Sequence, residues 1–510
     1  MTAKKWFICA AAISLMLTSV MPGASLRASA APESSTTSNA QTVPIIGASA
    51  QAPYESYNYN FWEEATPMPA AYLPERYITG KDLGVGDFLE PADMYISKSG
   101  TVYVLDTGNQ RIVQFREDGT GIKVISSFDN QGTQDGFSNP SGIFTDHEEQ
   151  IYVADTGHKR IVILSPEGEL ERIIQNPESD VLPAGFQFQP LKVTVDEAKR
   201  VFVVANGVYE GIMQFDEKGT FIGYVGTIKV KRNYVDYFWR LVSTKAQRAQ
   251  MALFVPTEFS NQDIDHKGFV YATNIDVGSK EPIKRLNPSG EDVLKRYGYY
   301  DVSGDIYYRR TTGPSKFVDI KVLGDGMYSA LDSTQGRVFT YDESGNLLYI
   351  FGGLGNQLGM FKTPVAVEHV GERQLVLDRG KGNIVVFVPT EFGANVNQAV
   401  RLHDQGEDTE AEVYWNRVLE LNSNYDIAYT GIGKAKLMRK ENKEALAYFK
   451  LGMDRKNYSV AYKRYRREVM KEHFGTVLTL LLAAAAAFAV YKAARHWKQR
   501  RERGHEAGGF

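Results

Sequence analysis

Short apolar runs of about five residues recur between residues 72 and 392, and turn residues separate them. Two of these runs, Thr101–Leu105 and Asn383–Val388, are rich in Val, Ile and aromatic residues, which favour strands. One ten-residue phrase is repeated, because Val104–Val113 returns 49 residues later as Val153–Val162. Each copy reads as a strand, an Asp-Thr-Gly turn and a second strand, and repetition at this period is typical of propeller blades.

Six such blades can be traced along the chain. Their second strands end near these residues: Asp106, Asp155, Ala205, Asn274, Asp332 and Asp378. A proline stands 15 residues before that point in the first three blades, at Pro91, Pro140 and Pro190. Blades one to five each show a fourth strand pattern, whereas the sixth shows none. The isolated strand pattern Glu75–Thr79 is therefore predicted to complete blade six, which removes an open sheet edge. We predict a mainly β fold, a closed six-bladed propeller over residues 54–392.

Spaced glycines before Phe and Pro, as in Phe351–Pro364, accompany the blades. The turns also carry Asp and Arg five residues apart, in the pairs Asp106/Arg111, Asp155/Arg160 and Asp332/Arg337. With these features the blades resemble NHL repeats, a family of six-bladed propellers. Blades three and four depart from the pattern, with Asn206 and Asn274 near their turns. We interpret the turn pairs as structural, because Asp accepts backbone N–H groups in turns and the following Arg can pair with it.

The period of the apolar residues changes after residue 393. Ala411, Trp415 and Leu419 are matched 34 residues later by Ala445, Phe449 and Met453. Small and large apolar residues at this spacing resemble two tetratricopeptide (TPR) repeats. The predicted helices span 395–405, 408–420, 425–439, 442–455 and 459–473. We assign residues 393–473 to a TPR-like helical stalk.

The two ends of the chain indicate export and a membrane anchor. Lys4 and Lys5 precede an apolar run, and Ala28–Ala30 supplies a small-residue cleavage site, so residues 1–30 are predicted to be a signal peptide. Residues 31–53 are predicted to be a disordered leader. Residues 474–491 lack charge and are just long enough to cross a bilayer. An exported chain halted there leaves the basic tail, residues 492–510, in the cytoplasm and the bulk of the protein outside.

Composition excludes several kinds of chemistry. The only cysteine, Cys9, lies in the predicted signal peptide, so the mature chain has no disulfide, thiolate metal site or cysteine nucleophile. The net charge of −3, together with export, argues against a nucleic-acid partner. Neither a Gly-x-Ser-x-Gly elbow nor a His-Glu-x-x-His motif occurs.

A metal-dependent enzyme is the alternative. Propeller lactonases and lyases, which this fold resembles, hold a divalent cation in the central channel with Glu, Asn, Asp or His side chains. The histidines here do not recur at equivalent blade positions: His147, His158, His266 and His369. Four aspartates lie near first strands, where the channel is expected: Asp93, Asp263, Asp265 and Asp319. They do not assemble into a coordination shell from the sequence, so we expect no cofactor and keep a channel cation as the alternative.

Two insertions are the candidate ligand-binding elements. The first lies within 229–253 and contributes Lys231, Arg232, Tyr234, Tyr237, Phe238, Trp239 and Arg240. The second lies within 297–310 and contributes Tyr299, Tyr300, Tyr307, Tyr308, Arg309 and Arg310. Aromatic faces with Arg can stack on sugars or anchor a protein partner. Packing on the propeller rim and a solvated loop are their structural alternatives. Chain direction predicts that both insertions share the face of the Asp-Thr-Gly turns, opposite the helical stalk.

These observations lead to three hypotheses of function. The first is a non-enzymatic binding or scaffold protein, tethered to the cell membrane by a single helix, that engages an exported protein or a cell-surface glycan. The second is a metal-dependent lactonase, hydrolase or lyase. The third is an assembly factor that recruits the subunits of a membrane complex, such as a transporter, through the TPR-like helices.

Overall fold

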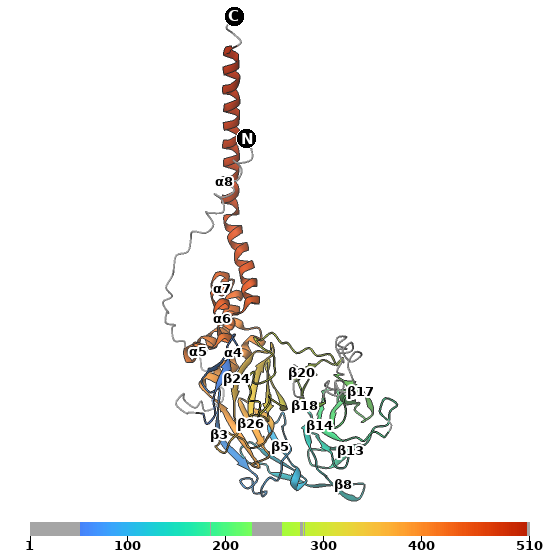
Figure 1. Ribbon diagram of the computed structural model, residues 1–510. Helices are drawn as coiled ribbons and strands as arrows, with labels where there is room; N and C mark the ends of the chain where they lie inside the picture. The colour runs from blue at the N-terminus through green and yellow to red at the C-terminus, as the bar shows by residue number, and fades with distance from the viewer. Residues whose placement is uncertain (1–51, 184, 227–257, 276–278, 280, 507–510) are drawn as a thin grey trace, which may run out of the picture. The chain divides into compact units, whose positions relative to one another are not determined.

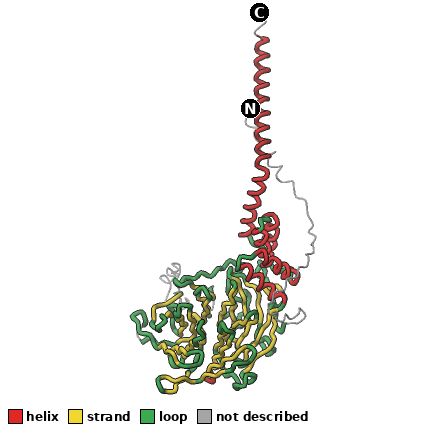
Figure 2. The backbone as a smooth tube through the Cα atoms, turned by 180° about the vertical axis from the view of Figure 1, so that it is seen from behind, coloured by secondary structure: helices red, strands yellow, loops and turns green. Residues whose placement is uncertain are grey.

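The computed structural model describes residues 52–183, 185–226, 258–275, 279 and 281–506, with side chains as far as Arg500. Strands form six sheets arranged as the blades of a six-bladed propeller, and helices follow them (Figures 1 and 2). This confirms the predicted six-bladed propeller with a C-terminal helical region. The predicted signal peptide, all but the end of the leader, the first insertion and the last four residues of the tail lie outside the described residues.

The first three blades each have four antiparallel strands in chain order. Blade one comprises β4 (Asp93–Ile96), β5 (Thr101–Asp106), β6 (Arg111–Arg116) and β7 (Lys123–Ile125). Blade two comprises β10 (Gly142–Thr145), β11 (Ile151–Asp155), β12 (Arg160–Leu164) and β13 (Leu170–Ile174). Blade three comprises β14 (Pro190–Val195), β15 (Val201–Ala205), β16 (Ile212–Phe215) and β17 (Phe221–Val225). A short helix, η1 (Thr107–Asn109), forms the turn of blade one, and a hairpin of β8 (Ser127–Asn130) and β9 (Thr133–Gly136) joins blades one and two.

The last three blades vary the pattern. Blade four has β18 (Phe259–Ile264), β19 (Val270–Asn274) and β20 (Ile283–Leu286). Blade five has β21 (Phe317–Gly324), β22 (Met327–Asp332), β23 (Arg337–Asp342) and β24 (Leu347–Phe351). Blade six has β25 (Pro364–Val370), β26 (Arg373–Asp378) and β27 (Asn383–Pro389). The expected fourth strand of blade four is wrong for the described residues: after β20 the chain makes one antiparallel bridge, Leu286 to Asp292, and then leaves the sheet.

An early strand completes blade six, as the sequence predicts. Strand β3 (Tyr72–Thr79) pairs antiparallel with β27, with Ile78 opposite Ile384 and Tyr72 opposite Pro389. Before it, β1 (Tyr57–Tyr59) and β2 (Ala65–Pro67) form a hairpin, and β1 contacts the outer strand β24 of blade five. The start of the described chain therefore joins the last two blades.

Apolar side chains fill the spaces between neighbouring blades. One cluster joins blades one and two through Leu105, Ile143 and Val153, and another joins blades six and one. The cluster between blades five and six is the largest and also contains helix residues, among them Phe392 and Trp415. The helical region therefore shares one core with the propeller.

The C-terminal helices are α4 (Glu391–Asp404), α5 (Asp408–Leu421), α6 (Asp426–Met438), α7 (Asn442–Leu451) and α8 (Arg455–Glu506). Helix α4 begins right after β27, where the Thr390 hydroxyl caps it by accepting the Gly393 N–H. Arg401 of α4 donates to Asp325 and Glu372, in the turns after the first strands of blades five and six. The helices therefore lie on the propeller face opposite the Asp-Thr-Gly turns, as chain direction predicts.

Helix α8 is continuous, and it includes both the predicted helix 459–473 and the apolar segment 474–491. Its start packs on α6 and α7 through Ala461, which is buried with Leu437 and Phe449. Among the described residues, α8 is the helix that is long and apolar enough to cross a membrane. Leu480, Phe488 and Val490 in its apolar part are more than 60% exposed.

Candidate functional site

The aspartates of the Asp-Thr-Gly turns hold the chain that enters their own blade. The carboxylate of Asp106 accepts the Leu89 N–H at 2.7 Å, and that of Asp155 accepts the Ser138 N–H at 2.7 Å. Each carboxylate also accepts a hydrogen bond from the Nε of the arginine five residues later. The distance from Arg111 Nε to Asp106 is 2.8 Å. The Asp155–Arg160 distance is the same. Both aspartates are fully buried.

The threonine and glycine of the same turns have separate structural roles. The Thr107 hydroxyl donates to the Pro140 carbonyl at 2.8 Å, which links blade one to the entry of blade two. A Cβ on Gly108 would lie 2.6 Å from the Leu89 carbonyl oxygen, so only glycine fits there. All three residues of the motif thus serve blade geometry, and their spread around the ring brings no two of them across one substrate.

The third turn pair is not an ion pair. Asp332 accepts the backbone N–H groups of Lys316, Thr334 and Gln335, while Arg337 pairs with Asp305. Asp305 lies in the second insertion, which runs along blade five and brings this buried carboxylate to Arg337. The expected Asp332/Arg337 pair is therefore wrong.

The central channel gathers side chains from the first strand of every blade. It is lined by Asp93, Met94, Tyr95, Ile143, Phe144, Lys192, Val193, Thr194, Asn261, Gln262, Asp263, Asp319, Ile320 and Glu368. Three of the four aspartates predicted near the channel are among them. Asp265 is not, because it lies in the turn after β18, where Arg285 binds it at 3.0 Å.

The channel aspartates accept hydrogen bonds from backbone N–H groups of neighbouring blades. Asp93 accepts the Ile143 N–H at 2.9 Å from blade two. Asp263 accepts the Val322 N–H at 2.8 Å from blade five, and Asp319 accepts the Val367 N–H at 2.6 Å from blade six. Each carboxylate therefore braces the first strand of the next blade.

Two lysines neutralise three of the channel carboxylates. The ammonium of Lys192 lies 2.6 Å from Asp93. That of Lys321 lies 3.0 Å from Glu368 and 3.6 Å from Asp263, with the ring centroid of Tyr95 at 4.4 Å. Burial opposes the charge of Lys321, but Asp263 and Glu368 raise its pKa above the usual value. Burial raises the pKa of Asp319 to about 7, with Lys192 opposing and Asp93 adding to the shift.

This donor set does not fit a catalytic divalent cation. The channel-lining residues include no histidine, and each channel carboxylate has at least one oxygen bound to an ammonium or backbone N–H group. Only one oxygen of Glu368 is bound in this way; its Oε2 has no hydrogen-bond partner among the described residues. Within the part of the chain that the structure describes, no group of three or more His, Cys, Asp or Glu side chains is placed to hold a metal. The space open to the centre of a water molecule in the channel is only about 20 Å³, which suits a water molecule rather than a substrate.

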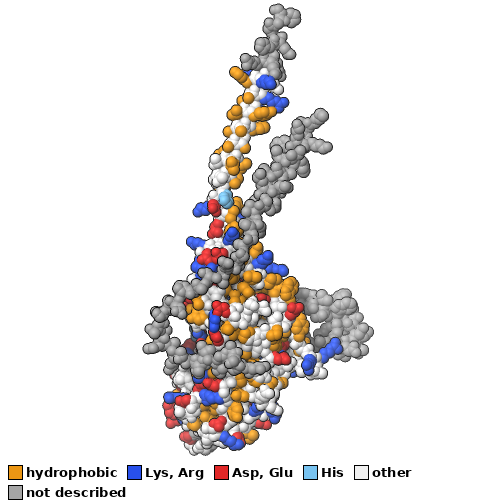
Figure 3. All heavy atoms as spheres, turned by 90° about the vertical axis from the view of Figure 1, so that its left-hand side faces the viewer, with side chains coloured by type: hydrophobic (Ala, Val, Ile, Leu, Met, Phe, Trp, Pro, Cys, Tyr) orange, Lys and Arg blue, Asp and Glu red, His pale blue; other side chains and the backbone are white. Residues whose placement is uncertain are grey.

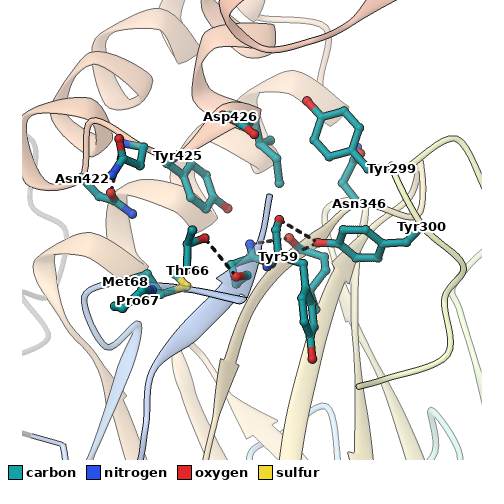
Figure 4. Close-up of a pocket in the computed structure, with 14 residues that line it drawn as sticks. Tyr59, Thr66, Pro67, Met68, Tyr299, Tyr300, Asn346, Asn422, Tyr425 and Asp426 are labelled. Atoms are coloured by element: carbon teal, nitrogen blue, oxygen red, sulfur yellow. Dashed lines mark hydrogen bonds between the residues drawn. The ribbon is translucent and has the colours of Figure 1, made fainter. Parts of the chain in front are cut away.

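A second pocket lies where the helices meet blade five (Figure 4). The β1–β2 hairpin supplies Tyr59 and Thr66, the second insertion supplies Tyr299 and Tyr300, and the start of α6 supplies Asp426. Its volume is about 460 Å³ with the space open to solvent, but only about 20 Å³ admits the centre of a water molecule. This pocket too is a packed junction.

The second insertion does not lie on one face, which corrects the sequence-based expectation. The Tyr299 hydroxyl donates to the Gly452 carbonyl after α7, and the Tyr300 hydroxyl donates to Asn58 at 3.1 Å. These two tyrosines join the propeller to the helices and the hairpin, because the insertion crosses to the helical side before it returns along blade five. Tyr307 and Tyr308 are 64% and 50% exposed, and Arg309 and Arg310 are also exposed.

The predicted binding residues of the first insertion, Lys231, Arg232, Tyr234, Tyr237, Phe238, Trp239 and Arg240, lie outside the described residues. Sequence reasoning missed Lys192, Lys321 and Asp305. The signal for Lys321 was available, because residues two apart on a strand face the same side and Asp319 was already a candidate.

Comparison with known proteins gives a partial match. Residues 94–188, which cover blades one and two, match the family model of the SMP-30/gluconolactonase/LRE-like region. No curated protein matches the chain.

Solved structures match the chain at low identity. Virginiamycin B lyase from Staphylococcus aureus is 13% identical, with 68% of this chain and 93% of that chain covered and a TM-score of 0.37. A gluconolactonase from Xanthomonas campestris is 10% identical, with 69% and 99% covered and a TM-score of 0.40. With TM-scores below 0.5, these likenesses carry no argument about activity.

Proposed function

We propose that this chain is a non-enzymatic binding protein, tethered to a membrane by α8, whose propeller presents a ligand-binding surface. The observation that carries this proposal is the pairing of Lys192 and Lys321 with carboxylates of the channel. Their ammonium groups compensate the carboxylates that a cation would need as ligands. The channel then serves as a brace between blades, and recognition is left to the surface.

The exposed part of the second insertion is the proposed contact surface among the described residues. Tyr307 and Tyr308 expose half or more of their surface beside Arg309 and Arg310. Aromatic and Arg side chains supply the anchors of many interfaces. The partner is an exported protein or a cell-surface glycan.

The same proposal includes the type of the blades, the type of the helical repeats and the membrane topology. The blades are of NHL type, and α4–α7 form two TPR-like hairpins. Close packing of Gly431 on Trp415 and of Gly433 on Phe449, where a Cβ would lie 2.2 Å and 2.7 Å away, supports paired hairpins. Residues 474–491 cross the membrane, the propeller lies outside the cytoplasm, and the tail lies inside.

Two alternative functions are each favoured by a specific observation. The match of residues 94–188 to a gluconolactonase-like family model favours a propeller lactonase or lyase. Val413, Met438 and Leu451 on the helices are more than 55% exposed, which favours an assembly role through the TPR-like helices.

The test uses the full chain in detergent micelles and in native membranes. Assays of lactone opening with and without added divalent cations are expected to show no turnover above background. Cross-linking in membranes is expected to capture a partner that the double substitution Tyr307→Ala and Tyr308→Ala loses. Tyr77→Ala, an exposed tyrosine on β3, is the matched control. Turnover that depends on a cation would overturn the proposal.

A further inference from the structure

The first turns of α8 carry an unusual excess of positive charge. Residues 455–471, here called the basic stem, contain Arg455, Lys456, Lys463, Arg464, Arg466, Arg467 and Lys471. All seven side chains are exposed, and among the described residues none of them forms an ion pair. The single acid of the stem, Glu468, accepts the Asn442 side-chain N–H at 2.6 Å.

Helical geometry separates the charges by face. At 3.6 residues per turn, successive residues are about 100° apart around the axis. Ala461 and Glu468 therefore project to one side, which packs on α6 and α7. Five of the basic residues fall within a sector of about 120° on the opposite side: Arg455, Lys456, Lys463, Arg466 and Arg467. This basic stripe extends about 18 Å along the axis at 1.5 Å per residue.

Aromatic side chains border the basic stripe. Tyr458 and Tyr462 stack on each other along the helix with their planes 4° apart, and they are 37% and 50% exposed. At the start of the stripe, Lys456 lies 4.5 Å from the ring centroid of Tyr297, which is itself 67% exposed. Such rings offer flat faces to the carbon skeleton of a sugar or polyol.

We propose that the basic stripe of α8 binds an extended polymer of sugar or polyol units joined by phosphates. Arg binds phosphate with paired N–H donors, and a row of such side chains fits an anion that repeats along its length. A small anion would contact only one or two of these residues. This proposal needs only the helix and its charges, so it stands apart from the propeller's ligand.

A bilayer surface fits the stripe less well than a polymer. Counted along the axis from Phe474, where the apolar part begins, Lys463 lies about 16 Å away and Arg455 about 28 Å away. Charges are largely screened beyond about 8 Å at physiological salt. Lipid headgroups at the end of the apolar part would therefore leave most of the stripe without a partner. Figure 3 shows the orange apolar stretch of the helix with blue basic side chains at its two ends.

The experiment measures binding of a fluorescent linear polyphosphate to the full chain in detergent micelles by anisotropy. The test variant replaces Lys463, Arg466 and Arg467 by Glu. The matched control carries the same charge change beyond the apolar part, at Lys492, Arg495 and Lys498. Polyglutamate and phosphatidylglycerol, added to the micelles as mixed micelles, are the competing probes. A second test variant with Ala at the three stem positions preserves helix propensity, and circular dichroism checks that α8 is intact.

The proposal expects polyphosphate to bind the wild-type chain and the control alike. The Glu variant should bind roughly tenfold more weakly or worse, and the slope of log K against log salt should fall by about 2 in magnitude for the Ala variant. Unchanged binding in both stem variants would overturn the proposal. Tighter binding of polyglutamate or of phosphatidylglycerol than of polyphosphate would also overturn it.

Discussion

The ammonium of Lys321 lies 3.0 Å from the carboxylate of Glu368, inside the ring formed by the first strands of the six blades. Both side chains are less than 9% exposed, so the pair lies where an unpaired charge is costly. Lys192 and Asp93 form a second such pair in the lining of the same channel. Compensated charges therefore line the axis of the propeller.

Replacing Lys321 by Met is expected to destabilise the fold by about 3–5 kcal/mol. The substitution leaves Glu368 and Asp263 buried without their counter-charge. The matched control is Lys199→Met, whose partner Glu148 is 54% exposed, and it is expected to cost less than about 1 kcal/mol. Urea unfolding in detergent micelles gives both values. Equal stability of the two variants would mean that the channel pair has no structural role.

The pH dependence of stability should show the titration of Asp319. Its pKa is raised to about 7 in the folded protein from an ordinary value of 3.8, so the folded state holds this proton more tightly than the unfolded state. The contribution of Asp319 to stability therefore falls as pH rises from about 4 to 7, by up to about 1.4 kcal/mol per unit, and is constant above 7.

Asp319→Asn isolates this contribution, because other groups cancel in the difference between the two proteins. His369 is one such group: burial lowers its pKa to about 4, so its contribution is lost as pH falls from about 6.5 to 4. The stability of the wild type minus that of the variant is expected to decline across pH 4–7. A difference that is flat over this range would contradict the assignment.

The ring closure can be tested with two neighbouring residues of β3. Ile78 is 4% exposed between blades six and one, whereas Tyr77 is 54% exposed on the other side of the strand. Ile78→Asp is expected to cost at least about 3 kcal/mol because it buries a charge in the closing sheet. Tyr77→Asp is expected to change stability by about 0.5 kcal/mol or less. Thermal unfolding separates them, and similar losses for both would argue against closure by β3.

The ion pair of Asp305 and Arg337 should hold the N-terminal hairpin on blade five. Asp305 also accepts the Tyr59 hydroxyl at 3.0 Å, and Arg337 donates to the Tyr57 hydroxyl at 2.7 Å. Burial, followed by the Asp305 charge, raises the pKa of Tyr59 to about 12, so the tyrosine stays a donor. Asp305→Asn is expected to cost about 3 kcal/mol and to expose the hairpin to proteolysis.

The control for that substitution is Asp301→Asn in the same insertion, since Asp301 is exposed and Ser303 binds its backbone carbonyl rather than its side chain. Its expected cost is about 0.5 kcal/mol or less, with no change in cleavage. Mass spectrometry of the proteolytic fragments measures the cleavage. If the hairpin of Asp305→Asn resists proteolysis, the ion pair does not hold the hairpin on blade five.

Gly108 should be intolerant of a side chain. Gly108→Ala brings a Cβ against the Leu89 carbonyl, which cannot move because Asp106 holds the same residue's N–H. The expected loss is about 1–3 kcal/mol. A Cβ at Gly475 in α8 meets nothing within 4 Å, so Gly475→Ala should not destabilise the protein, and alanine favours the helix. A neutral Gly108→Ala would show that the close approach is not needed.

Local repeats made the blades readable from the sequence, and contacts between distant segments did not. The Asp106 and Asp155 turns could be assigned because strand, turn and strand are contiguous. The partner of Arg337 could not, because Asp305 reaches it from an insertion with no counterpart in other blades. Tyr299 likewise meets Gly452, and no period relates two segments so far apart. The channel lysines were not predicted because carboxylates near the channel were considered as metal ligands. The lysines that neutralise these carboxylates were not considered.

Divalent-cation binding by the purified full chain tests the central claim most directly. Elemental analysis and titration with Mn²⁺ or Ca²⁺, followed by thermal unfolding, are expected to show no bound metal and no shift in Tm for the wild type. The same titration is expected to stabilise a variant in which Lys192 and Lys321 are both Met, because its channel carboxylates are then uncompensated. One metal ion per wild-type chain, removed by a chelator together with stability, would contradict the account.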